Sequence, residues 1–238
     1  MSALIPVAND LWHVDGGELR QPGGVYMPSR ATLVRLRDRS LLLYSPVAIA
    51  DQTAAAIDAL GPVAHIVAPT RIHHLFVAGA IARWPKAETH AAPGLAAKRP
   101  DLRFDHALAS GAWRGGDELD VEVVAGAPKL GEAVFFHRAS RALICADLVF
   151  HVTRPRNLRT KIVLAIVGAG GGRLAQSRAW RFLRRDRAAA RGSVDRILAW
   201  PIERVAPCHG EAIAIDARGL ARVVTRVYGG TPPLALAP

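Results

Sequence analysis

Short apolar runs rich in Leu and Val, separated by Gly, Pro and Asp turns, alternate along the chain with segments of helical periodicity. This pattern predicts strands at residues 11–15, 31–36, 41–44, 64–68, 88–91, 119–124, 133–137, 142–147 and 204–207. It predicts helices at residues 53–60, 75–84, 173–191, 194–200 and 213–227, with an irregular segment at 148–172. Asp51 is expected to cap the first of these helices.

The order of these elements predicts two similar halves, each made of strands followed by helices. Such halves bury their apolar faces when two sheets pack face to face and the helices lie outside. The sequence therefore predicts an α/β (α+β) fold, a four-layer αββα sandwich. We expect one domain over residues 1–238, with an Arg-rich insert at about 148–196 and a frayed tail at 229–238.

Charge is concentrated in the insert. The chain carries a net charge of +11, and residues 154–196 hold twelve Arg or Lys against Asp186 and Asp195. This stretch therefore supplies +10 of the net charge of +11. A local basic patch is typical of a protein that binds an acidic partner. A small anionic substrate or ligand is the expected partner, and nucleic acid is an alternative without a binding motif to support it.

No segment reaches the roughly 18 to 20 apolar residues that span a bilayer, so no membrane span is expected. The first ten residues lack a basic region followed by an apolar one, which predicts no secretory signal. Two cysteines, Cys145 and Cys208, give no disulfide framework. A cytoplasmic, reduced protein is the expectation.

Histidine and aspartate side chains follow three predicted strands. His73 and His74 lie in the sequence Thr-Arg-Ile-His-His-Leu-Phe that ends at Phe76, Asp147 ends the strand Leu-Ile-Cys-Ala-Asp, and His209 lies in Pro-Cys-His-Gly. In the order of these landmarks, over roughly residues 9–225, the chain resembles the metallo-β-lactamase superfamily. It looks similar to a degenerate, uncharacterised branch of it, a domain of unknown function with a His-His-Leu-Phe motif.

The chain departs from the superfamily pattern at about half of the positions. Where the main motif normally reads Thr-His-x-His-x-Asp-His, Arg71 replaces the first histidine, Leu75 the aspartate and Phe76 the last histidine. The Pro-Gly-His turn is replaced by residues 126–128, and the Asp-Thr-Gly turn by residues 45–47. Three of seven expected ligand positions remain, at His73, Asp147 and His209.

The resemblance implies a hydrolase-like protein with at most one metal ion, Zn, Fe or Mn. Two histidines and one aspartate leave a coordination position for water. His74 and Glu132 are candidates for a fourth ligand, and Glu132 and Asp147 for catalytic roles. Arg71 is expected to place a positive charge at a lost ligand position.

An alternative explains the same residues without a metal. His73, Asp147 and His209 would pair as buried polar groups in a vestigial cleft, and the Arg-rich insert would serve a non-catalytic binding protein or form a solvated face. The remaining histidines have no ligand spacing and are expected to be strand or surface residues. They are His13, His65, His90, His106, His137 and His151.

Overall fold

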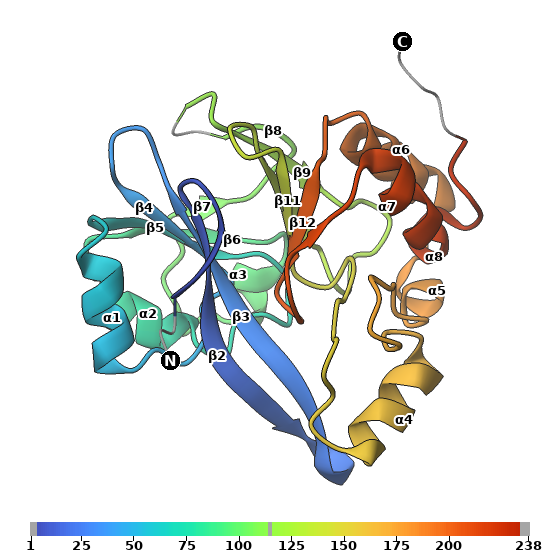
Figure 1. Ribbon diagram of the computed structural model, residues 1–238. Helices are drawn as coiled ribbons and strands as arrows, with labels where there is room; N and C mark the ends of the chain where they lie inside the picture. Colours follow the sequence, from blue (N-terminus) through green and yellow to red (C-terminus); the bar gives the residue numbers. More distant parts are fainter. Residues whose placement is uncertain (1–3, 114–115, 234–238) are drawn as a thin grey trace.

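The computed structural model describes residues 4–113 and 116–233, which form two β-sheets with helices on both outer sides (Figure 1). Within these residues the first sheet has seven strands in the order of the chain: β1 (Leu4–Ala8), β2 (Leu11–Gln21), β3 (Val25–Arg35), β4 (Leu41–Tyr44), β5 (Val63–Ala68), β6 (Glu88–Ala91) and β7 (His106–Ala107). The described part of the second sheet has six strands, in the order β13 (Ile213–Ala214), β12 (Arg204–Pro207), β11 (Ala142–Cys145), β10 (Ala133–His137), β9 (Leu119–Val123) and β8 (Gly111–Ala112).

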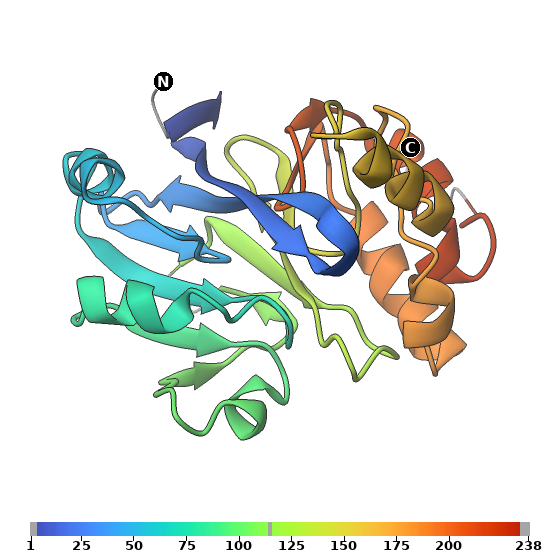
Figure 2. The ribbon, with the colours of Figure 1, turned by 90° about the horizontal axis from the view of Figure 1, so that it is seen from below.

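Helices cover the outer face of each sheet. Beside the first sheet lie α1 (Asp51–Asp58), α2 (Val77–Arg83) and α3 (Leu95–Lys98). The second half contributes α4 (Leu158–Val167), α5 (Trp180–Leu183), α6 (Arg187–Leu198), α7 (Ala217–Val223) and α8 (Thr225–Tyr228). Figure 2 shows α1 and α2 on one side of the molecule and the orange helices of the second half on the other. The predicted αββα arrangement is confirmed.

The central core lies between the sheets. Tyr44 and Val67 from the first sheet pack with Phe135 and Ile144 from the second, and all four are buried. Burying such a side chain contributes roughly 1.5–3 kcal/mol. The Tyr44 hydroxyl also donates a hydrogen bond of 2.9 Å to the Ala133 carbonyl, which ties the two sheets together.

Parallel pairing sets the place of the site. β4 pairs with β5 in parallel, and β11 pairs with β12 in parallel, so the loops after each pair leave from one edge of their sheet. The segments that carry His73, Asp147 and His209 follow β5, β11 and β12. The backbone N–H of Arg30 on β3 donates to the Cys208 carbonyl at 2.9 Å and joins the two sheets beside these loops.

The Arg-rich insert differs from the prediction of one helix over residues 173–191. The prediction of one continuous helix is wrong. The chain forms the short helix α5 and then starts a separate helix, α6, after Asp186. The Asp186 side chain accepts a hydrogen bond from the Ala189 N–H and caps α6. The segment 148–172 is not irregular throughout, since Asn157 caps α4 and Gly168 ends it. Sequence periodicity missed both helix starts because the caps, rather than an apolar face, define them.

Two other helix predictions also need correction. Residues 213–227 form the short strand β13 and two helices, because the Asp216 side chain accepts the Gly219 N–H and starts α7 there. Asp51 is the first residue of α1 and makes no cap; the N-cap is Ala50. Of the expected tail 229–238, residues 234–238 lie outside the described part of the chain.

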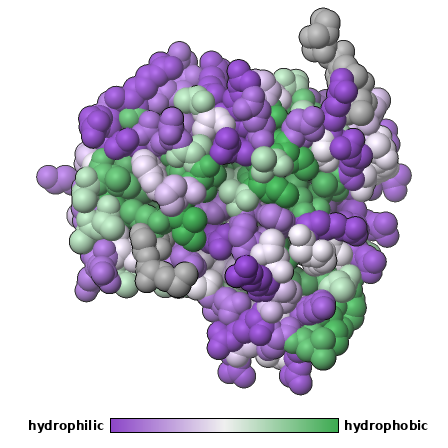
Figure 3. All heavy atoms as spheres, viewed as in Figure 1, coloured by the Kyte–Doolittle hydropathy of each residue, from purple (hydrophilic) through white to green (hydrophobic). Residues whose placement is uncertain are grey.

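The surface of the insert is mixed in character. α4 exposes Leu158, Ile162 and Ile166 along one side, and Figure 3 shows the corresponding hydrophobic patch at the lower right. In residues 4–113 and 116–233, no helix combines the length and apolar character that crossing a bilayer requires.

Candidate metal centre

His73, Asp147 and His209 come together where the loops after β5, β11 and β12 meet. One donor atom from each of the three side chains lies within 4.8 Å of the other two. His73 Nε2 is 3.3 Å from Asp147 Oδ2, and His209 Nε2 is 3.7 Å from Asp147 Oδ1. A tetrahedral ion with ligand bonds of about 2.0–2.2 Å needs donor atoms roughly 3.4 Å apart, so donor atoms within 4.8 Å of one another can bind one ion once the side chains draw closer.

The second nitrogen of each imidazole is already engaged. Ser45 Oγ lies 2.7 Å from His73 Nδ1, and the Pro28 carbonyl lies 2.8 Å from His209 Nδ1. A hydrogen bond at Nδ1–H leaves Nε2 with its lone pair, as a metal ligand requires. The ring of Phe150 stacks on His209 at 5.1 Å between centroids and fixes the plane of that imidazole.

Asp147 is held as an anion. Burial alone would raise its pKa, but the adjoining imidazoles of His73 and His209 outweigh burial and lower it. Asp147 Oδ2 is buried and has no hydrogen-bond partner, although His73 lies near it. The side chains of His73, Asp147 and His209 are 13%, 12% and 11% exposed, so the cluster is mostly buried yet reaches solvent.

Glu132 lies beneath this cluster and not within it. Its Oε1 accepts the backbone N–H groups of Ala146, Asp147 and Leu148 at 2.8, 3.0 and 3.1 Å. Burial, followed by the neighbouring charge of Asp147, raises the pKa of Glu132. The predicted role of Glu132 as a fourth ligand is therefore not what this geometry favours; the side chain positions the loop that carries Asp147.

His74 and Arg71 point to other partners. His74 Nδ1 lies 2.8 Å from Arg99 Nη1. Arg71 Nη1 donates to the Pro128 carbonyl at 3.0 Å, and its guanidinium lies beside Gly94. Neither side chain belongs to the cluster that His73 forms among the described residues.

Sequence reasoning missed three contacts of this centre. Ser45, directly after β4, and Pro28 on β3 hold the histidines although they lie far from them in the chain. The indole N–H of Trp180 donates to the Asp147 carbonyl at 3.0 Å, which anchors the insert to the loop. The two cysteines are buried, and burial raises the pKa of each thiol, so they stay protonated in the core.

Comparison with solved structures places this arrangement in a known fold. The chain is similar to a metallo-beta-lactamase from Pontibacter korlensis, with 15% identity, a TM-score of 0.62, and coverage of 95% of this chain and 96% of that one. It is similar to the metallo-beta-lactamase FIM-1 from Pseudomonas aeruginosa in the mono-zinc form, with 15% identity, a TM-score of 0.61, and coverage of 95% and 94%.

A third similar structure is the metal-soaked flavodiiron core Flv1 from Synechocystis, with 11% identity, a TM-score of 0.62, and coverage of 95% of this chain and 60% of that one. Residues 9–97 match the family model described as a domain of unknown function, DUF4336. No curated protein matches the sequence. With two sheets, outer helices and these structural neighbours, the chain has the metallo-β-lactamase fold.

Proposed function

We propose that the chain is a hydrolase-like protein that holds one divalent metal ion between His73, Asp147 and His209. The observation that supports this is the convergence of three donor atoms within 4.8 Å from three strand ends. The chemistry of the set, two imidazoles and one carboxylate, suits zinc and also iron or manganese. The mono-zinc form named for the Pseudomonas aeruginosa neighbour is in line with a single ion.

A bound divalent ion would supply Lewis-acid chemistry for the hydrolysis of an ester, amide or phosphodiester. The residues of the chain prepare the site for it. Ser45 and the Pro28 carbonyl fix the imidazoles, while Glu132 and Trp180 fix the main chain on both sides of Asp147. The anionic Asp147 would balance part of the charge of a bound ion.

Metal analysis of the purified protein tests this proposal. Wild type, Asp147→Asn, His73→Gln and the control Asp101→Asn would be purified without added metal and measured by mass spectrometry. Asp101 is exposed and pairs with Arg99, outside the cluster. We expect Asp147→Asn and His73→Gln each to hold one equivalent less than the control, and to lose any hydrolysis of esters, lactones or phosphodiesters. Equal metal content in all four proteins would overturn the proposal.

A second candidate function is the binding of an anionic ligand by the insert. A pocket of about 500 Å³ is lined by Arg181, Arg184, Arg187 and Arg226. Burial, followed by neighbouring arginines, lowers the pKa of Arg184 and of Arg226, so the guanidinium groups repel one another. A phosphate or carboxylate group would relieve that repulsion and accept several N–H groups.

Pyrophosphate is a suitable probe for this pocket. We expect it to raise the melting temperature of wild type and of the control Arg218→Gln, which lies outside the pocket lining, but not of Arg184→Gln/Arg226→Gln. An equal shift in all three proteins would reject the pocket as the site. Retention on DNA that falls steeply with salt, and that the double variant lacks, would assign the same arginines to nucleic acid instead.

A further inference from the structure

A second group of ligand-type side chains lies near the opposite end of β5 from the candidate metal centre. His65 Nδ1 is 3.3 Å from His90 Nε2 and 3.6 Å from Glu88 Oε2, and His90 Nε2 is 4.0 Å from the same oxygen. His106 Nε2 lies 3.3 Å from Glu88 Oε2 as well. Three imidazoles therefore surround one carboxylate oxygen.

The register of three parallel strands brings these residues together. His65 on β5 is the pairing partner of Glu88 on β6, and His90 on β6 is the partner of His106 on β7. Glu88 and His90 are two residues apart on one strand, so their side chains lie on the same face of the sheet. Neighbouring partners in a sheet also share a face, which places all four side chains on one surface.

The surroundings hold the imidazoles in place. The Trp113 ring contacts the tilted His90 ring at 4.6 Å and meets the His65 ring edge to face at 5.3 Å between centroids. Asp105 accepts hydrogen bonds from the backbone and hydroxyl of Thr89 and thereby fixes β7 against β6. The cluster is thus ordered by contacts that do not use the Glu88 carboxylate.

We propose that His65, Glu88, His90 and His106 bind one zinc ion. Imidazole nitrogens and a carboxylate oxygen are a typical zinc donor set, and tetrahedral bonds of about 2.0–2.2 Å put donor atoms roughly 3.4 Å apart. The separations of 3.3, 3.6 and 4.0 Å among His65, His90 and Glu88 are close to that value. His106 Nε2 is 3.3 Å from Glu88 Oε2 but lies outside the group of mutually close donor atoms that His65, Glu88 and His90 form, so it becomes the fourth ligand when its ring moves toward the other two imidazoles.

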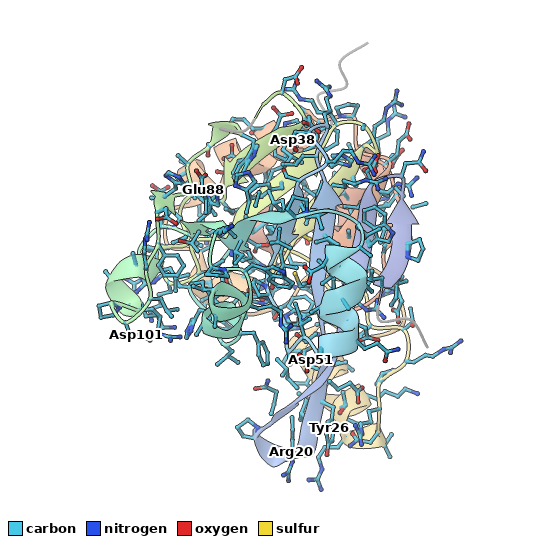
Figure 4. All side chains as sticks on the ribbon, turned by 90° about the vertical axis from the view of Figure 1, so that its left-hand side faces the viewer. Arg20, Tyr26, Asp38, Asp51, Glu88 and Asp101 are labelled. Atoms are coloured by element: carbon cyan, nitrogen blue, oxygen red, sulfur yellow. The ribbon has the colours of Figure 1, made fainter. Side chains whose placement is uncertain are left out.

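The site has an entry path and a structural role. The Glu88 side chain is 56% exposed, whereas that of His90 is 2% exposed, so an ion enters from the Glu88 side (Figure 4). Glu88 and His106 also line a pocket of about 360 Å³ at the surface. Four protein ligands leave no position for a substrate, which is typical of structural zinc. The ion fastens β5, β6 and β7 at the edge of the first sheet.

Zinc binding in an Asp147→Asn background tests this site separately from the candidate metal centre. Equilibrium dialysis with zinc, followed by mass spectrometry, would compare that protein with versions that also carry Glu88→Gln, His106→Gln or the control Glu203→Gln. Glu203 matches Glu88 in exposure, at 54% against 56%, and its loss changes the charge equally. Both test residues are partly exposed, so the variants are expected to fold.

We expect the Asp147→Asn protein and its Glu203→Gln version to bind one zinc per chain and to melt at a higher temperature with zinc. Glu88→Gln and His106→Gln should each weaken binding by more than the roughly 10–100-fold that loss of an outer-shell partner costs. No zinc uptake by the folded Asp147→Asn protein would overturn the inference. Equal affinity in Glu88→Gln, His106→Gln and Glu203→Gln would also overturn it.

Discussion

The buried carboxylate of Glu132 accepts the backbone N–H of Asp147 at 3.0 Å. The same oxygen accepts the N–H groups of Ala146 and Leu148, so one side chain satisfies three successive amides after β11. Backbone amides that leave a sheet edge inside a protein need such partners, because a buried N–H without one costs about 1–3 kcal/mol. Glu132 therefore sets the shape of the loop from which Asp147 reaches the cluster.

Substitutions at Glu132 should distinguish the contribution of its acceptor oxygen from the contribution of its charge. Glu132→Gln keeps an acceptor oxygen at the same place, and we expect its free energy of unfolding to stay within about 1 kcal/mol of wild type. Glu132→Ala leaves three buried amides without an acceptor and should cost roughly 3 kcal/mol or more. Urea denaturation measures both. Equal destabilisation by the two variants would show that the amide contacts are not what Glu132 contributes.

Ser45 should control metal affinity through His73. Its hydroxyl lies 2.7 Å from His73 Nδ1, and loss of such an outer partner typically weakens metal binding about 10–100-fold. Ser45→Ala is the test, with Ser45→Gly beside it because residue 45 has a φ of 56°. Ser140→Ala is a matched control, since Ser140 Oγ lies 2.7 Å from His137 Nδ1 outside the centre. Zinc titration should distinguish them; an unchanged affinity in Ser45→Ala and Ser45→Gly would contradict the assignment.

Trp180 should link the insert to the centre. Trp180→Phe removes the N–H that the Asp147 carbonyl accepts and leaves a buried acceptor, which costs about 1–3 kcal/mol. The control is Trp200→Phe, because an aromatic ring there still stacks on Phe136. We expect Trp180→Phe alone to lower both the free energy of unfolding and zinc affinity. A loss of stability without a change in affinity would confine Trp180 to a packing role.

His13 should make the fold sensitive to acid. Burial, followed by the charge of Arg30, lowers the pKa of His13 from 6.5 to about 3. Below pH 6.5 the unfolded chain binds a proton at His13, whereas the folded chain binds it only near pH 3. The free energy of unfolding therefore falls as the pH drops through this window. Between pH 7 and pH 5 the expected loss is about 2 kcal/mol.

His13→Gln supplies the comparison, because glutamine does not titrate in this range. The unfolding free energy of the variant should depend less on pH between 7 and 5 than that of wild type, by the same amount of about 2 kcal/mol. Parallel pH profiles for the two proteins would show that His13 is not the group responsible.

The fold could be predicted where apolar runs decide it. β4, β6, β10 and β12 have the bounds that the sequence predicts, because each is a short run between turn residues. The helices of the insert could not be predicted in this way. α4 and α6 start at the side-chain caps Asn157 and Asp186, within an arginine-rich segment of weak periodicity. Because arginines are frequent in this segment, Asn157 and Asp186 cannot be recognised as helix N-caps from the sequence pattern.

The cluster around His73 and the cluster around His65 differ in how readily the sequence predicts them. His73, Asp147 and His209 each follow a strand, and strand ends are easy to locate. His65, His90 and His106 lie within or at the start of strands, and they meet only because β5, β6 and β7 pair in one register. The sequence predicts them to be strand or surface histidines without ligand spacing. That expectation places them on strands but misses their convergence, which parallel pairing of the strands would have indicated.

Glu132 and Trp180 both hold residue 147 through its main chain, one at the N–H and one at the carbonyl. The loop is thus shaped without help from the side chain at that position. A substitution of the Asp147 side chain therefore leaves both main-chain contacts in place. Such a framework separates the stability of the αββα sandwich from the chemistry of the side chain at residue 147.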